Sequence, residues 1–96
     1  MIVLNVTYKC KPDLREAFLE AILREGIDDA CRAEDGNLLY AYWLPFDGGD
    51  ELLLVEHWRD ADALKAHAMQ PHYRRLGELK QAYVDETVVE KYAPLE

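Results

Sequence analysis

Residues 51–58 read ELLLVEHW, and four consecutive apolar side chains precede Glu56 and Trp58 in this short run. A strand with one face in water alternates apolar and polar residues, whereas Leu52–Val55 offer apolar side chains to both faces. The run therefore predicts a sheet strand that is covered on both sides. Because a large exposed apolar face is unfavourable, we expect two copies of the chain to pack sheet against sheet in a homodimer.

Strong local signals flank this strand on both sides. Asn37–Leu44 is aromatic and apolar and ends at Pro45, which predicts a second strand. The turn at 46–50 joins the two strands and contains two glycines where positive φ is needed. Downstream, Asp60 is a suitable N-cap for a helix that should break near Pro71 and then resume.

The two ends of the chain complete the pattern. Two further strands are predicted at Ile2–Tyr8 and Tyr83–Tyr92. Between the first of these and Gly36, an amphipathic helix should have Pro12 in its first turn and run to about Ala33. Gly36 would then stop the chain from continuing as a helix. The order β-α-β-β-α-β predicts an α+β, ferredoxin-like domain over residues 1–96, with a four-stranded antiparallel sheet and both helices on one face.

Charge and composition exclude several classes of partner. The 96 residues carry a formal net charge of −8, which disfavours binding to nucleic acid or to an anionic membrane surface. The N-terminal residues lack the features of a signal peptide and are too polar to span a bilayer, so we expect a cytoplasmic protein. Cys10 and Cys31 lack C-x-x-C spacing and should be small buried hydrophobes.

One stretch carries a resemblance to a known family. Residues 35–45 read DGNLLYAYWLP and residues 52–76 read LLLVEHWRDADALKAHAMQPHYRRL, with the pattern E-x-W-x-x-x-x-A-L-x-x-H followed by Pro-His-aromatic. This resembles the antibiotic biosynthesis monooxygenase (quinol monooxygenase-like) family. The resemblance implies a dimeric α+β barrel. Several members oxidise quinols or polycyclic phenols with dioxygen and without metal or flavin, others isomerise a phosphorylated signal sugar, and a distant branch degrades haem.

Glu56 and His67 are the candidate catalytic residues. Glu56 shares a strand face with Leu54 and Trp58, where a carboxylate is unfavourable unless it is paired. His67 lies on the following helix on the side of Leu64, so the two side chains should meet if that helix covers the Glu56 face. Such a pair could take a proton from a phenol, although a structural ion pair and a packed histidine are the competing interpretations.

Six further residues are candidates for substrate binding. Trp58 would form a flat wall for an aromatic compound, or simply a core anchor. His72 and Tyr73 follow the helix break, and breaks often border a pocket mouth. The resemblance implies that Asn5 contacts a substrate oxygen or dioxygen if it faces the helices, but a structural polar residue is the alternative. Asn37 and Tyr42 would help to shape the cavity, together with Tyr40 of the same predicted strand.

The sequence predicts no metal site and no cofactor. His57 should point away from Glu56, and His67 and His72 are five apart across a proline rather than four apart on one helical face. The chain contains no glycine-rich phosphate loop or dinucleotide fingerprint. For haem, the resemblance places Gly77 where the degrading branch carries its iron ligand.

We therefore expect a cofactor-independent monooxygenase that oxidises a quinol or polyphenolic compound with dioxygen. A second hypothesis is an isomerase or tautomerase that acts on a small signal or sugar-derived metabolite with the same acid–base pair. A third is a dimeric module that binds an aromatic ligand without turnover. Oxygen consumption separates the first hypothesis from the other two.

Overall fold

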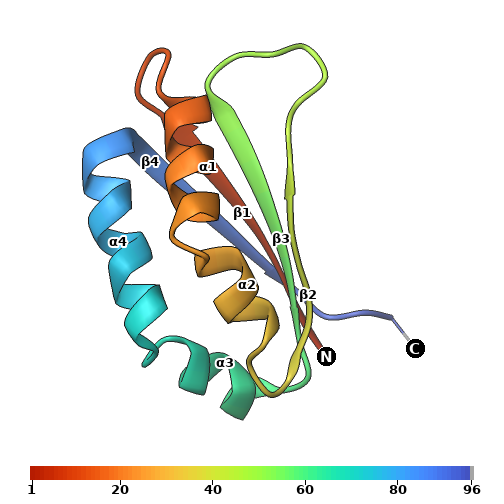
Figure 1. Cartoon of the computed structure of the whole chain (residues 1–96). Helices are drawn as coiled ribbons and strands as arrows, with labels where there is room; N and C mark the ends of the chain where they lie inside the picture. The colour runs from red at the N-terminus through yellow and green to blue at the C-terminus, as the bar shows by residue number, and fades with distance from the viewer. Residues whose placement is uncertain (96) are drawn as a thin grey trace.

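The structure of the protein is a computed structural model that describes residues 1–95. Figure 1 shows the sheet with all four helices on one side. In chain order the elements are β1 (Ile2–Cys10), α1 (Arg15–Arg24), α2 (Ile27–Arg32), β2 (Asn37–Trp43), β3 (Glu51–Trp58), α3 (Ala61–His67), α4 (Pro71–Tyr83) and β4 (Val84–Tyr92).

The predicted α+β, ferredoxin-like fold is confirmed. The strands lie in the order β2-β3-β1-β4, and every pair of neighbours in this sheet is antiparallel. β3 and β1 are the inner strands, so the apolar run at 52–55 lies in the middle of the sheet. Side chains alternate along β3, with Leu52, Leu54, Glu56 and Trp58 buried against the helices and the intervening residues only partly buried.

The core lies between this inner face of the sheet and the helices. Phe18 and Ile22 of α1 are completely buried and pack with the inner side chains of β1, such as Val6 and Tyr8. The Phe18 ring meets the edge of Tyr8 at a centroid distance of 5.3 Å. Across residues 1–95, every helix is too short or too polar to cross a bilayer.

The single helix expected from Pro12 to about Ala33 is wrong. The chain forms two helices, because Gly26 adopts a left-handed φ of +70° at the N-cap of α2 and interrupts α1 after Arg24. Pro12 also precedes the first helix instead of opening it. The backbone N–H of Asp13, at φ +64°, donates to Asp50, which holds this turn against the β2–β3 loop.

The helix break at Pro71 and the cap at Asp60 are confirmed. The Asp60 carboxylate accepts a hydrogen bond from the backbone N–H of Ala63 at 2.9 Å. α3 ends at His67, and α4 begins at Pro71, which suits a first-turn position because its missing N–H would lack a helical partner there. The break turns the chain so that His67 and His72 lie on adjoining helix ends.

Candidate active site

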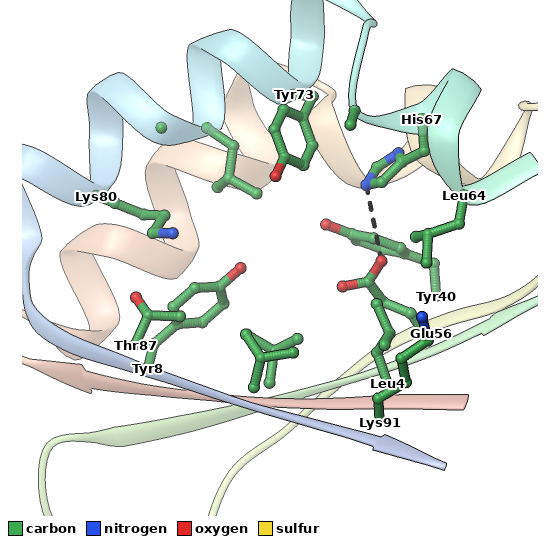
Figure 2. A pocket seen from close by; sticks show the side chains of 15 residues that line it. Leu4, Tyr8, Tyr40, Glu56, Leu64, His67, Tyr73, Lys80, Thr87 and Lys91 are labelled. Atoms are coloured by element: carbon green, nitrogen blue, oxygen red, sulfur yellow. Dashed lines mark ion pairs between the residues drawn. The ribbon is translucent and has the colours of Figure 1, made fainter. Parts of the chain in front are cut away.

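A cavity of about 400 Å³ lies between the inner face of the sheet and helices α3 and α4 (Figure 2). Its floor is formed by inner-face residues of β1, β3 and β4, and its roof by side chains of α3 and α4. A volume of this size is in the range of small-molecule sites in proteins. The main lining side chains are Leu4, Val6, Tyr8, Tyr40, Glu56, Leu64, His67, Tyr73, Leu76, Lys80, Thr87 and Val89.

Glu56 and His67 meet at one end of the cavity, as predicted. Glu56 points inward because it alternates with His57 on β3, and His67 points down from the last turn of α3. His67 Nε2 lies 3.7 Å from Glu56 Oε1, and Figure 2 shows the two side chains pointing toward each other at the cavity wall. Both side chains are less than a tenth exposed.

Trp58 is the hydrogen-bond partner of the Glu56 carboxylate. Its indole Nε1–H donates to Glu56 Oε1 at 3.0 Å. Burial raises the pKa of the Glu56 carboxyl above its usual range, while the Trp58 hydrogen bond and the nearby His67 oppose part of that shift. A buried carboxyl with a raised pKa is a suitable proton acceptor for a weakly acidic substrate.

The sequence argument missed Glu34, which lies in the turn after α2. Its Oε2 is 2.7 Å from Nδ1 of His67 and 2.7 Å from Nε2 of His72. If His67 donates its Nδ1–H to Glu34, its Nε2 lone pair faces Glu56 and the cavity. In that tautomer, His67 presents an acceptor nitrogen towards the cavity.

Aromatic rings hold the His67 imidazole in place. Its ring lies 4.5 Å from the Trp58 ring at an interplanar angle of 34°, and the ring of Tyr73 meets it edge-on at 5.1 Å. With Nδ1 held by Glu34 and the ring packed against Trp58 and Tyr73, the imidazole has little freedom to rotate. Such restraint is typical of a preorganised acid–base group.

The structure brings only part of the predicted set to the cavity. Of the eight predicted residues, Glu56, His67 and Tyr73 line it. Trp58 is fully buried beneath the pair and supports it, instead of forming a wall for the substrate. His72 lies behind His67 on the Glu34 carboxylate, and its expected place at the rim of this cavity is corrected accordingly.

Asn5, Asn37 and Tyr42 also lie outside the cavity lining. Asn5 does not face the helices, because Leu4, Val6 and Tyr8 occupy the inner face of β1, so the condition for its predicted substrate contact is not met. The Asn37 side chain donates to the backbone carbonyl of Leu39 at the start of β2. Tyr42 contributes indirectly, since its hydroxyl lies 3.4 Å from that of Tyr40, which does line the cavity.

Tyr40, predicted to help shape the cavity, does line it and pairs with Glu56 across β2 and β3. Tyr8 and Lys80 are polar lining residues that were not predicted, and Tyr8 could have been found from the alternation along β1. Burial raises the pKa of both phenols, so they stay protonated as hydrogen-bond donors. Lys80 of α4 lies over the Tyr8 ring at 5.7 Å, and burial lowers the pKa of its amine. Figure 2 places Lys80 at the opposite end of the cavity from Glu56.

The fold and the site together define a class of protein. It is a ferredoxin-like α+β domain in which a buried carboxylate–imidazole pair faces a mostly apolar cavity between the sheet and its helices. Within this class, the chain belongs to the antibiotic biosynthesis monooxygenase family, because the model of that family matches residues 1–79.

Known proteins agree with this assignment. The chain is 40% identical to Rv0793 of Mycobacterium tuberculosis over 90 residues, covering 90% of this chain and 83% of the relative. It is 32% identical to YcnE of Bacillus subtilis over 74 residues, covering 77% and 76%. Both relatives are provisionally named as monooxygenases.

Solved structures share the fold over nearly the whole chain. The structure of Rv0793 superimposes with a TM-score of 0.85 at 31% identity, covering 99% of this chain and 95% of that one. The crystal structure of PA3566 from Pseudomonas aeruginosa has a TM-score of 0.87 at 27% identity, with coverage of 99% and 94%.

Proposed function

We propose that the protein is a cofactor-independent monooxygenase that oxidises a quinol-like or polyphenolic compound with dioxygen. The observation that carries the proposal is the buried Glu56–His67 pair at the end of an apolar cavity. A phenol needs a base to become an electron-rich anion, and such an anion can reduce dioxygen directly. The family membership and the names of the relatives support a monooxygenase reaction.

The reaction balances for a phenol with a free ring position. Glu56 and His67 take the phenol proton, and the phenolate passes one electron to dioxygen. The two radicals combine to form a carbon–oxygen bond. Loss of the ring C–H proton then breaks the O–O bond, and this proton and the one held by the pair both leave with the departing oxygen as water. The product is a quinone with one atom of dioxygen, and the substrate itself is the reductant.

The remaining lining residues fit this substrate class. Tyr8, Tyr40 and Tyr73 provide aromatic surfaces and hydroxyl donors for a flat phenolic compound. Lys80 at the far end of the cavity would attract the negative charge that the phenolate spreads to the ring position away from Glu56. The mostly apolar lining excludes water, which strengthens these interactions.

Oxygen consumption by the purified, chelator-treated protein against a panel of quinols and anthrones tests the proposal. We expect uptake above the autoxidation rate for at least one compound. Glu56→Gln and His67→Ala should each lower kcat by about 100-fold or more, because general base catalysis typically contributes that much. His57→Ala provides a matched control, since His57 lies on the other face of β3.

Absence of uptake from the folded protein across the panel would refute a monooxygenase of this substrate class. The same pair could still move a proton in an isomerase or tautomerase, which consumes no oxygen. A module that only binds aromatic compounds would show saturable binding that Glu56→Gln leaves intact. Full activity in both variants on a confirmed substrate would refute the assigned roles of Glu56 and His67.

We also propose that the protein acts as a homodimer. The sheet face opposite the helices carries Leu39, Trp43, Leu53 and Val55, and we call this set the outer apolar face. Trp43 is 58% exposed and Leu39 is 37% exposed in the single chain. Packing this face against its copy would bury these side chains and explain why β3 is apolar on both sides.

A further inference from the structure

On the side of His67 that faces away from the cavity, its side chain comes together with those of Cys31, Glu34 and His72. The proposed reaction gives Cys31 and His72 no role. We propose that Cys31, Glu34, His67 and His72 form a binding site for one divalent transition metal ion, for which zinc is the best match. One donor atom from each side chain lies within 4.8 Å of every other. This inference goes beyond the proposed oxidation and does not depend on it.

The spacing of these residues is typical of zinc sites. Cys31 and Glu34 are separated by two residues at the end of α2, and His67 and His72 by four residues across the α3–α4 break. Two close pairs, with spacing of the C-x₂₋₄-C and H-x₃₋₅-H type, recur in four-ligand zinc sites. Here Glu34 takes the place of the second cysteine. The prediction of no metal site rested on the spacing of the cysteines and of the histidines taken separately, because sequence alone could not place Cys31 and Glu34 beside His67 and His72.

The donor types also match zinc in charge and chemistry. A thiolate, a carboxylate and two imidazoles are the ligands that zinc prefers, and the two anions would neutralise the dication in this buried place. The structure already aims Nδ1 of His67 and Nε2 of His72 at Glu34 Oε2. The metal would take the place of the protons in these two hydrogen bonds and of the Cys31 thiol proton.

One outer partner suitable for a metal site lies near the proposed ligands. With Nδ1 of His67 on the metal, its Nε2–H would point to Glu56 Oε1, which lies 3.7 Å away. A ligating histidine usually donates its other ring N–H to such a carboxylate. Cys31 is fully buried in the core, which would restrict thiolate oxidation.

A separate hollow provides a path for the ion. Glu34 and His72 line a surface hollow of about 470 Å³ that also includes Asp35, Arg59 and Gln70. The ion could therefore reach two of its ligands, Glu34 and His72, from outside without crossing the substrate cavity. Once bound, it would hold His67 in the form whose Nε2 carries a proton, so His67 could no longer accept one from the substrate. Zinc would thus oppose the proposed oxidation.

Titration of the metal-free, untagged full-length protein with zinc chloride and with cobalt chloride tests the site. Calorimetry should show one zinc ion per chain, and cobalt should give a thiolate charge-transfer band with the intense visible bands of a tetrahedral complex. Cys31→Ser should abolish the charge-transfer band and weaken zinc binding at least about tenfold. Cys10→Ser and His57→Ala, which change the other cysteine and the other histidine, should bind like the wild type.

Two results would overturn the site: no zinc binding above that of a His72→Asn variant, or a cobalt spectrum that Cys31→Ser leaves unchanged. Circular dichroism of each metal-free variant shows whether it is folded. If Cys31→Ser does not fold, Glu34→Gln and His72→Asn replace it and should weaken zinc binding by a similar factor. The binding readouts require no enzyme activity, so failure of the monooxygenase proposal would leave this inference standing.

Discussion

Glu34 is the residue on which the geometry of the site depends most. One carboxylate oxygen holds two imidazole rings at 2.7 Å, and the Glu34 side chain is only 9% exposed. Removing the charge while keeping the shape would leave only a neutral amide oxygen, which is a weaker acceptor for the two rings than the carboxylate. The Nδ1–H of His67 would then be free to move to Nε2, where the ring loses its lone pair towards the cavity.

We predict that Glu34→Gln lowers kcat for quinol oxidation by about tenfold or more and changes KM little, because Glu34 orients the base without touching the cavity. Steady-state oxygen consumption in the presence of chelator measures both constants. Asp35→Asn is the matched control, since this neighbour is almost fully exposed and pairs with Arg59 at the surface. A kcat equal to that of the wild type would show that His67 is oriented without Glu34.

Trp58 allows a second prediction at the scale of a residue. Trp58→Phe keeps an aromatic ring but removes the donor to Glu56 Oε1, which leaves a buried acceptor without its partner. The free energy of unfolding should fall by about 1–3 kcal/mol, measured by urea denaturation. The pKa of Glu56 should rise further, because the Trp58 hydrogen bond lowers it in the wild type.

A double-mutant cycle separates this hydrogen bond from the lost indole volume. In the Glu56→Gln background, Trp58→Phe should cost less than in the wild type, because the carboxylate that needs the donor is already gone. Equal costs in both backgrounds would mean that the loss comes from packing alone.

At the scale of elements, two glycines decide where the helices end. Gly26 separates α1 from α2, and Gly36 leads from the turn of Glu34 into β2. Both have positive φ, at +70° and +88°. They differ in their surroundings, because a Cβ at Gly26 would meet nothing within 4 Å, whereas a Cβ at Gly36 would lie 2.5 Å from Cβ of Ala63.

This difference predicts unequal costs for the same substitution. Gly26→Ala should lower the free energy of unfolding by about 1–2 kcal/mol, the cost of a left-handed residue with a side chain. Gly36→Ala should cost about 1–3 kcal/mol more, since α3 must move away from the turn. Chemical denaturation of both variants measures the difference.

The contact with Ala63 can be tested directly. If the extra cost at Gly36 comes from this contact, Gly36→Ala combined with Ala63→Gly should be more stable than the sum of the two single changes predicts. Strict additivity would place the cost elsewhere. Because Gly36 directly follows the Glu34–Asp35 turn, the single variant should also weaken activity through the position of Glu34.

At the scale of the whole molecule, the outer apolar face leads to a prediction about assembly. Leu53→Glu and Trp43→Glu should each convert the proposed dimer to a monomer, because two copies of each carboxylate would be buried across the two-fold axis. Size-exclusion chromatography with light scattering measures the mass. Leu23→Glu is the matched control, since Leu23 is 52% exposed but lies on α1 on the helix side.

A wild-type mass equal to that of one chain at micromolar concentration would contradict the proposed dimer. If both outer-face variants remain dimeric, another surface makes the interface. Either result would leave the cavity and the Glu56–His67 pair in place, because both are formed within one chain.

The sequence by itself determined the order of the elements, most of their limits and the inward position of Glu56. These features depend on local causes, namely the alternation along β3, the cap at Asp60 and the breaks at Pro71 and Gly36. The break at Gly26 escaped prediction because a glycine inside an apolar helical pattern can either continue the helix or end it.

The tertiary structure alone decided which distant side chains meet. Glu34 reaches His67 and His72 only because the α2 turn packs against the α3–α4 break, and no spacing within the sequence encodes that contact. The roles of Asn5 and Trp58 likewise depended on which face of the sheet and which depth of the core each occupies. Local patterns determine how the chain bends, but contacts between distant elements depend on how whole elements pack.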